Sequence, residues 1–193
     1  MERPARVALL IRLPLLLAAA VVLGGGRGVA AQALTQEEAL LLAFPDADRV
    51  ERRTAYLDDA QLQRAAALAG RDVEVESGVV TYYVAIEGGA PVGVAYFDAH
   101  RVRTLPEVLM IVVDAEDRIR RLDVLRFAEP PEYRPPLGWL AQLLGRVLDD
   151  DLSPRRGIAA ITGATLTTRA VTGAARRVLA VHNVIAPLRD DPR

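Results

Sequence analysis

Hydrophobic positions along the chain follow two different spacings, and each spacing predicts one kind of element. In the middle of the chain, apolar and β-branched residues fill 79–86 and 91–97, and a short Gly-rich turn separates them. Such a pair of runs indicates a β-hairpin. The runs 107–113 and 118–127 flank a second polar turn in the same way. Two hairpins in series predict an antiparallel meander.

Helical signals precede the hairpins. The segment 35–38 has the form of a capping box and predicts a helix that begins near residue 36 and ends before Phe44. An aspartate pair precedes a second helical pattern over 60–69, and Gly70 is placed to end that helix. The polar stretch 46–57 between the two helices fits either a helix or a strand.

Two further helices are predicted after the hairpins, beyond an irregular, proline-rich stretch over 128–138. Over 139–148, apolar residues recur at helical spacing. The face they form would carry Leu140, Leu143, Leu144 and Val147. A stronger pattern over 166–185 predicts a long C-terminal helix. Its buried stripe would hold Val171, Ala174, Ala175, Val178 and either Leu179 or Val181. The predicted fold class is therefore α+β, a single domain with an antiparallel sheet of hairpins and flanking helices.

Residues 1–33 have the parts of an export signal. Three arginines precede an apolar stretch over 13–23, and small residues offer a cleavage site at 31–33 or at 29–31. An uncleaved anchor formed by 9–24 is the alternative, although a spanning helix needs about 20 apolar residues. Both interpretations predict a periplasmic or otherwise extracytoplasmic protein. The expected organisation is a signal over 1–33, an N-terminal helical segment over 34–78, a main domain over 79–186 and a tail over 187–193.

Composition narrows the possible chemistry. The chain has no cysteine, so it has no disulfide, iron–sulfur cluster or thioether-linked haem. Any redox chemistry would therefore need an organic cofactor. Without residues 1–33, 20 basic and 24 acidic residues remain, which gives no basic footprint for nucleic acid. His100 and His182 are too far apart in the sequence to suggest a metal site.

The segment 161–168, Ile-Thr-Gly-Ala-Thr-Leu-Thr-Thr, places four threonines at the mouth of the longest helical pattern. A helix start offers unpaired N–H groups and a favourable dipole to a phosphate group. Gly163 allows close approach of the backbone, and Thr165 can turn its hydroxyl toward the ligand. The alternative is that Thr162 or Thr165 simply caps the helix.

The residues Thr162-Gly163-Ala164-Thr165-Leu166-Thr167-Thr168 resemble the [Ser/Thr]-Gly-Ala-Thr-x-[Ser/Thr] signature of the FMN-binding domain family. This family includes flavin subunits of sodium-pumping NADH:quinone oxidoreductase and of Rnf-type electron-transport complexes. The resemblance covers roughly 79–186. It implies an exported electron carrier whose FMN is joined to Thr165 by a phosphoester, installed by a flavin transferase that uses FAD. A membrane-bound or soluble redox partner is also implied. The family pattern has an aspartate six residues before the acceptor, where this chain has Ala159.

The resemblance extends the expected flavin site to the proline-rich stretch. Glu129, Pro130 and Tyr133 fall where relatives carry a Glu-Thr-Pro segment close to the flavin. Trp139 would either stack on the flavin ring or anchor the following helix in the core. The expected FMN contacts are Thr162, Gly163, Ala164, Thr165, Leu166, Thr167, Thr168, Glu129, Pro130, Tyr133 and Trp139. No catalytic residue is expected, because the transferase would activate the threonine.

Two other functions stay open. A noncatalytic exported module could bind a phosphate-bearing ligand or a protein partner with the same turn, and the alanine at position 159 motivates this alternative. A flavin reductase acting on a small substrate is less favoured, because the sequence has no nucleotide fingerprint for NAD. Arg155 and Arg156 lie just before the threonine-rich turn, where they could assist a phosphate group.

Overall fold

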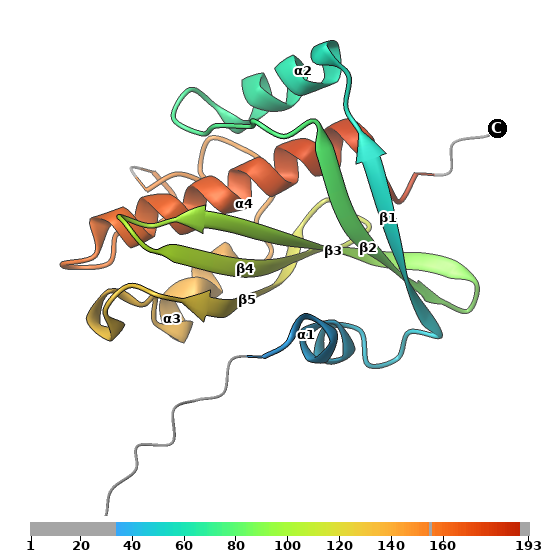
Figure 1. The fold of residues 1–193 in the computed structure, drawn as a ribbon, viewed down its shortest axis with the longest axis horizontal. Coiled ribbons are helices and arrows are strands. Elements are labelled where there is room, and N and C mark those ends of the chain that lie inside the picture. Colours follow the sequence, from blue (N-terminus) through green and yellow to red (C-terminus); the bar gives the residue numbers. More distant parts are fainter. Residues whose placement is uncertain (1–33, 155, 190–193) are drawn as a thin grey trace, which may run out of the picture. The chain divides into compact units, whose positions relative to one another are not determined.

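The computed structural model describes residues 34–154 and 156–189. The export signal predicted over 1–33 lies outside the described residues and stays a prediction. The elements, drawn in Figure 1, are α1 (Gln36–Ala43), β1 (Arg49–Tyr56), α2 (Asp59–Ala69), β2 (Val79–Glu87), β3 (Ala90–Arg101), β4 (Pro106–Val113), β5 (Ile119–Phe127), η1 (Pro131–Tyr133), α3 (Leu137–Leu140), η2 (Ala141–Leu143) and α4 (Thr165–Ile185). Within this described part, none of the helices has the length and apolar character needed to span a membrane.

The strands form one antiparallel sheet in the order β1-β2-β3-β4-β5, which confirms the predicted meander and the α+β class. The ambiguous stretch 46–57 supplies β1, which pairs with β2 from Arg49 opposite Ile86 to Tyr56 opposite Val79. Local sequence left this stretch open because its polar residues fit both periods. The segment forms a strand because the edge of β2 has backbone N–H and C=O groups that need partners, and pairing with β1 supplies them.

The first two helices begin and end as predicted. Thr35 and Glu38 exchange the two hydrogen bonds of a capping box at the start of α1. At α2, Asp58 and Gln61 exchange the same pair of bonds. Gly70 follows α2 with a φ of 99°, a left-handed conformation that glycine adopts without steric cost.

Apolar side chains cover both faces of the sheet. On one face, α4 packs the predicted stripe against the strands, and both Leu179 and Val181 are buried. The buried cluster on this face includes Val171, Ala175 and Leu179 of α4 and Val94, Leu109 and Ile111 of the sheet. On the other face, α1 and the adjoining Phe44 cover Ala85, Ala95, Met110, Val112 and Leu125. Each large aliphatic side chain buried in this way contributes about 1.5–3 kcal/mol to folding. The packing fixes α4 along the sheet and so fixes where its first turn lies (Figure 1).

The helix predicted over 139–148 is wrong beyond Leu143. The chain forms only the short helices α3 and η2 and leaves Leu144 46% exposed. Gly145 then turns with a φ of 75°, and its N–H donates to the carbonyl of Ile119. Ile119 in turn donates to the carbonyl of Arg146. The open edge of β5 therefore captures the segment that local periodicity assigned to a helix.

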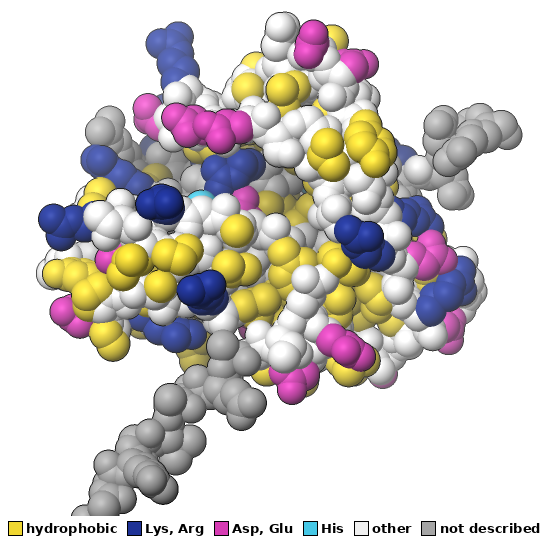
Figure 2. All heavy atoms as spheres, viewed as in Figure 1, with side chains coloured by type: hydrophobic (Ala, Val, Ile, Leu, Met, Phe, Trp, Pro, Cys, Tyr) yellow, Lys and Arg dark blue, Asp and Glu magenta, His cyan; other side chains and the backbone are white. Residues whose placement is uncertain are grey.

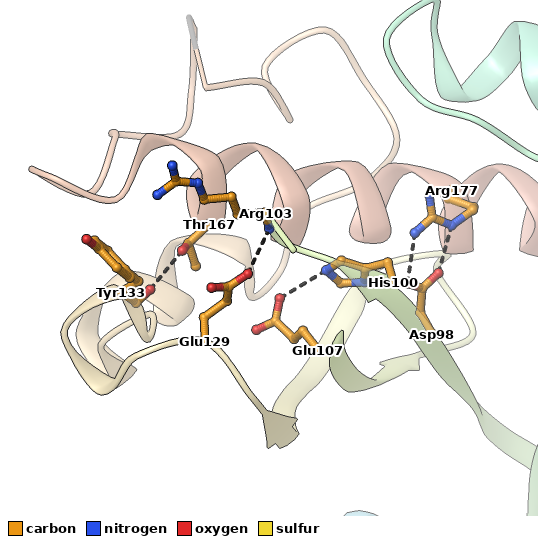
Figure 3. Close-up of polar contacts among 8 residues, drawn as sticks. All are labelled: Asp98, His100, Arg103, Glu107, Glu129, Tyr133, Thr167 and Arg177. Atoms are coloured by element: carbon orange, nitrogen blue, oxygen red, sulfur yellow. Dashed lines mark hydrogen bonds and ion pairs between the residues drawn. The ribbon is translucent and has the colours of Figure 1, made fainter. Parts of the chain in front are cut away.

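A buried charge network ties β3 to α4 and to β4 (Figure 3). Asp98 accepts two hydrogen bonds from the Arg177 guanidinium, both at 2.8 Å, and pairs with His100 Nδ1 at 2.8 Å. His100 Nε2 lies 3.0 Å from Glu107. Burial lowers the pKa of His100, but its bonds with the two carboxylates outweigh that effect and raise the pKa to about 9. Burial raises the pKa of Asp98, but its bonds with His100 and Arg177 bring it to about 2.

This network predicts a pH dependence of folding. The pKa of His100 is about 9 in the folded chain and 6.5 in the unfolded chain. Protonated His100 therefore stabilises the fold fully below pH 6.5, and this stabilisation is lost as pH rises through 9. The expected loss is on the order of 3 kcal/mol, since one pKa unit corresponds to about 1.4 kcal/mol. Denaturant unfolding at pH 6 to 10 measures it. His100→Gln should abolish this dependence while the control His182→Gln retains it, and an unchanged slope in His100→Gln would contradict the assignment.

Candidate functional site

The threonine-rich segment forms a tight turn that leads directly into α4. The Ala164 N–H donates to the carbonyl of Ile161, and Gly163 adopts a φ of 78°. This left-handed backbone needs glycine, since a side chain there is strained even with open space around it. Ala164 is the residue that begins the helix, and Thr165 is the first residue within it. The sequence prediction placed this start at residue 166.

Two of the four threonines are buried and hold the turn together. Thr168 Oγ1 accepts from the Ile161 N–H at 2.9 Å and donates to the Ala164 carbonyl at 3.3 Å. Thr167 Oγ1 donates to the Tyr133 carbonyl at 2.8 Å (Figure 3). Thr167 and Thr168 are 1% and 0% exposed. These residues therefore position the turn and do not offer their hydroxyls to a ligand.

The other two threonines are exposed, and neither caps the helix. The start of α4 has no side-chain cap, which excludes the alternative that Thr162 or Thr165 serves as one. Among the described residues, nothing accepts from the backbone N–H groups of Thr165, Leu166 and Thr167. Thr165 Oγ1 likewise has no hydrogen bond within that part of the chain. The first turn therefore presents three N–H donors and one free hydroxyl.

A cavity of about 270 Å³ opens beside this turn. Its lining comes from three segments: Val102 and Arg103 after β3, Glu129 and Tyr133 after β5, and 163–167 at the start of α4. This volume lies just below the range of about 300–1,000 Å³ that small-molecule sites occupy, so the cavity suits one part of an elongated ligand. The side chains of Tyr133, Val102 and Leu166 offer apolar contact, and the turn offers backbone N–H donors.

Glu129 holds the loop after β3, which contributes Val102 and Arg103 to the cavity wall. Its Oε1 atom accepts from the N–H groups of Leu105 and Thr104, both at 2.8 Å, and of Arg103 at 3.2 Å. The N–H groups of Leu105, Thr104 and Arg103 lower the pKa of Glu129, so the carboxylate stays ionised. Glu129 lines the cavity, as expected from the sequence, but its principal contacts are with the protein's own backbone.

The sequence did not reveal two of the cavity residues, Val102 and the charged Arg103. Arg103 is exposed, lines the cavity, and its guanidinium has no hydrogen bond or ion pair among the described residues. No local pattern marks it, because it enters the site only through the turn between β3 and β4. Arg156, by contrast, pairs with Asp150 at 2.6 Å and does not line the cavity, and Arg155 lies outside the described residues.

The remaining expected residues lie at the edge of the site or in the core. Pro130 is exposed and accepts from the Tyr133 N–H, so it shapes η1 without lining the cavity. Trp139 packs in the core, and its Nε1–H donates to the Ala159 carbonyl at 2.5 Å. This placement matches its interpretation as a core anchor. Ala159 has an exposed side chain, and its N–H donates to Gln142 Oε1.

The three N–H donors, the free hydroxyl and the unpaired guanidinium define a site for an anionic ligand, and a phosphate fits this donor set. Residues 106–180 match the family model of the FMN-binding domain. Over these residues the chain is therefore similar to the FMN-binding domain, and the match indicates FMN as the bound cofactor. The match begins at β4 and ends within α4, so it includes the threonine-rich turn. No curated protein matches the chain.

The role of Glu129 as a support for the cavity wall is testable. Glu129→Ala removes the acceptor of three N–H groups, so amide hydrogen exchange at 103–105 should accelerate about tenfold or more, because these N–H groups lose a charged hydrogen-bond acceptor. FMN binding should weaken in parallel. The matched control is Glu132→Ala, which removes an exposed carboxylate nearby. Unchanged exchange in Glu129→Ala would exclude the supporting role.

Proposed function

We propose that this chain is an exported electron-transfer protein that carries FMN in the cavity at the start of α4, joined by a phosphoester to Thr165. One observation carries the proposal: Thr165 is the only threonine of the turn that both lines the cavity and is exposed in the described structure. The FMN-binding domain match supports the cofactor, while the bond, the export and the electron transfer are inferences.

Backbone and side-chain groups of the chain would hold the phosphate directly. The N–H groups of 165–167 donate to its oxygens, and the positive end of the α4 dipole favours its charge. The Arg103 guanidinium, which lacks a counter-ion among the described residues, adds a positive charge to the cavity wall. Tyr133 and Val102 would contact the apolar parts of the ligand. These contacts position FMN, and the flavin itself supplies the redox chemistry when bound.

Attachment would use the free hydroxyl of Thr165. Its Oγ1 atom forms the new bond to the phosphorus of the FMN half of FAD, the pyrophosphate bond breaks, and AMP leaves. The hydroxyl proton passes to a base on the transferase, since Thr165 Oγ1 has no hydrogen-bond partner among the described residues that would activate it. A covalent link would keep FMN from dissociating outside the cell.

The covalent assignment predicts a mass increase that depends on a single residue. Coexpression with a flavin transferase should add the mass of FMN less one water to the full chain, and the adduct should persist after denaturation. Thr165→Val should remove it, because the nucleophilic oxygen is lost. Thr162→Val is the matched control, since Thr162 is an exposed threonine of the same turn. Intact-protein mass spectrometry gives the result, and an adduct that survives Thr165→Val would contradict the assignment.

Ala159 separates this proposal from a second candidate function. A module that binds a phosphate-bearing ligand without covalent flavin is favoured by the alanine at the position of the family's aspartate. The side chain of Ala159 is exposed and its backbone is held by Trp139 and Gln142, so the turn accommodates a larger side chain here. In the same experiment, an adduct that requires Ala159→Asp would favour the second function for the natural chain.

A further inference from the structure

The three segments that line the cavity share a surface pattern that the flavin site itself does not explain. Each segment carries one exposed large apolar side chain and at least one exposed arginine. The apolar members are Leu105, Tyr133 and Leu166, which are 42%, 36% and 47% exposed. The arginines are Arg101 at the end of β3, Arg103 after it, Arg134 after η1, and Arg169 on α4. We call these seven residues the cavity rim.

None of the four rim arginines forms an ion pair among the described residues, so their charges are not neutralised by a neighbouring carboxylate. Arg101 and Arg134 donate only to backbone carbonyls, and Arg103 and Arg169 have no hydrogen bond in that part of the chain. Six other arginines pair with carboxylates within the described residues. They are Arg49, Arg53, Arg121, Arg156, Arg177 and Arg189.

The rim is therefore basic in a chain that carries a formal charge of −1. Only two carboxylates lie in the three segments. Glu129 is held by backbone N–H groups, and Glu132 is exposed. Arg169 lies one helical turn beyond Thr165, so it occupies the same face of α4 as the hydroxyl in the cavity. At the left end of Figure 2, hydrophobic and arginine side chains are interspersed over the region where Figure 1 draws the start of α4.

We propose that the cavity rim is the docking surface for an acidic electron-transfer protein, an inference that rests on the proposed function. A few exposed apolar side chains interspersed with charged ones are compatible with a small, transient protein interface. Complementary charge would steer the partner to the open side of the cavity, where electrons enter or leave the flavin. Three half-exposed apolar side chains and the carboxylate of Glu132 favour a protein surface over insertion into an anionic membrane.

The test uses the full chain loaded with FMN and a reduced, acidic flavodoxin as the probe. Each encounter passes one electron from the flavodoxin to the bound FMN, and stopped-flow absorbance gives the second-order rate constant. We expect this constant to fall about tenfold between 20 mM and 300 mM salt, because screening removes the electrostatic steering. The triple variant Arg101→Gln, Arg134→Gln and Arg169→Gln should lower the low-salt rate constant by a similar factor and flatten its salt dependence.

A charge-matched control separates docking from overall charge. Arg52→Gln, Arg64→Gln and Arg71→Gln remove the same charge from exposed positions that do not line the cavity, so this variant should keep the wild-type rate constant. Equal losses in the two triple variants, or no loss in the rim variant, would overturn the proposal. The proposal would also be overturned if the wild-type chain bound phosphatidylglycerol vesicles and the rim variant, but not the control variant, lost this binding.

The flavin readouts keep this proposal distinct from the proposed function. Visible absorbance reports FMN content before mixing, and chemical reduction by dithionite reports a redox-active flavin. If the chain binds no FMN, the proposed function fails before docking is measured. If FMN is bound and reduced by dithionite, yet the flavodoxin rate constant ignores salt and the rim arginines, only the docking surface is refuted.

Discussion

The first turn of α4 leaves three backbone N–H groups without an acceptor among the described residues, and the rest of the site follows from this feature. A helix start normally meets this need with a capping side chain, as α1 and α2 do with Thr35 and Asp58. At α4 the corresponding residue is Ala164, which has no side-chain acceptor. The donors and the helix dipole are thereby left for a ligand, and an anion satisfies both.

An uncapped turn holds its geometry only if other contacts fix it. The Thr168 hydroxyl forms hydrogen bonds with two backbone groups of the turn itself. The Thr167 hydroxyl donates to the Tyr133 carbonyl and so links the turn to the segment after β5. Glu129 holds the loop after β3, and α4 is packed along the sheet by its buried stripe. The four threonines therefore divide into two buried supports and two exposed residues, of which Thr165 faces the cavity.

The sequence predicted what depends on local spacing and on a contiguous motif. Periodicity, caps and neighbouring residues are enough to predict five features: the meander, α1, α2, the buried stripe of α4 and the similarity to the FMN-binding domain. The sequence prediction counted Thr167 among the FMN contacts and did not show that its hydroxyl is used within the protein, because that bond goes to the η1 segment 34 positions away. Arg103 was missed because it enters the site only through the turn between β3 and β4. The helix predicted over 139–148 was wrong because the edge of β5 captured Gly145 and Arg146. Long-range backbone pairing overrides local propensity at such edges.

The claim that the phosphate of FMN sits on the first turn of α4 is tested most directly by backbone amide NMR of the chain prepared without a flavin transferase. FMN should shift the amide signals of Thr165, Leu166 and Thr167 strongly downfield, as new hydrogen bonds to phosphate oxygens form. Riboflavin, which lacks the phosphate, should leave these three signals nearly unchanged while it perturbs the cavity wall near Tyr133. Equal shifts with both ligands, or shifts confined to residues outside the cavity, would contradict the account.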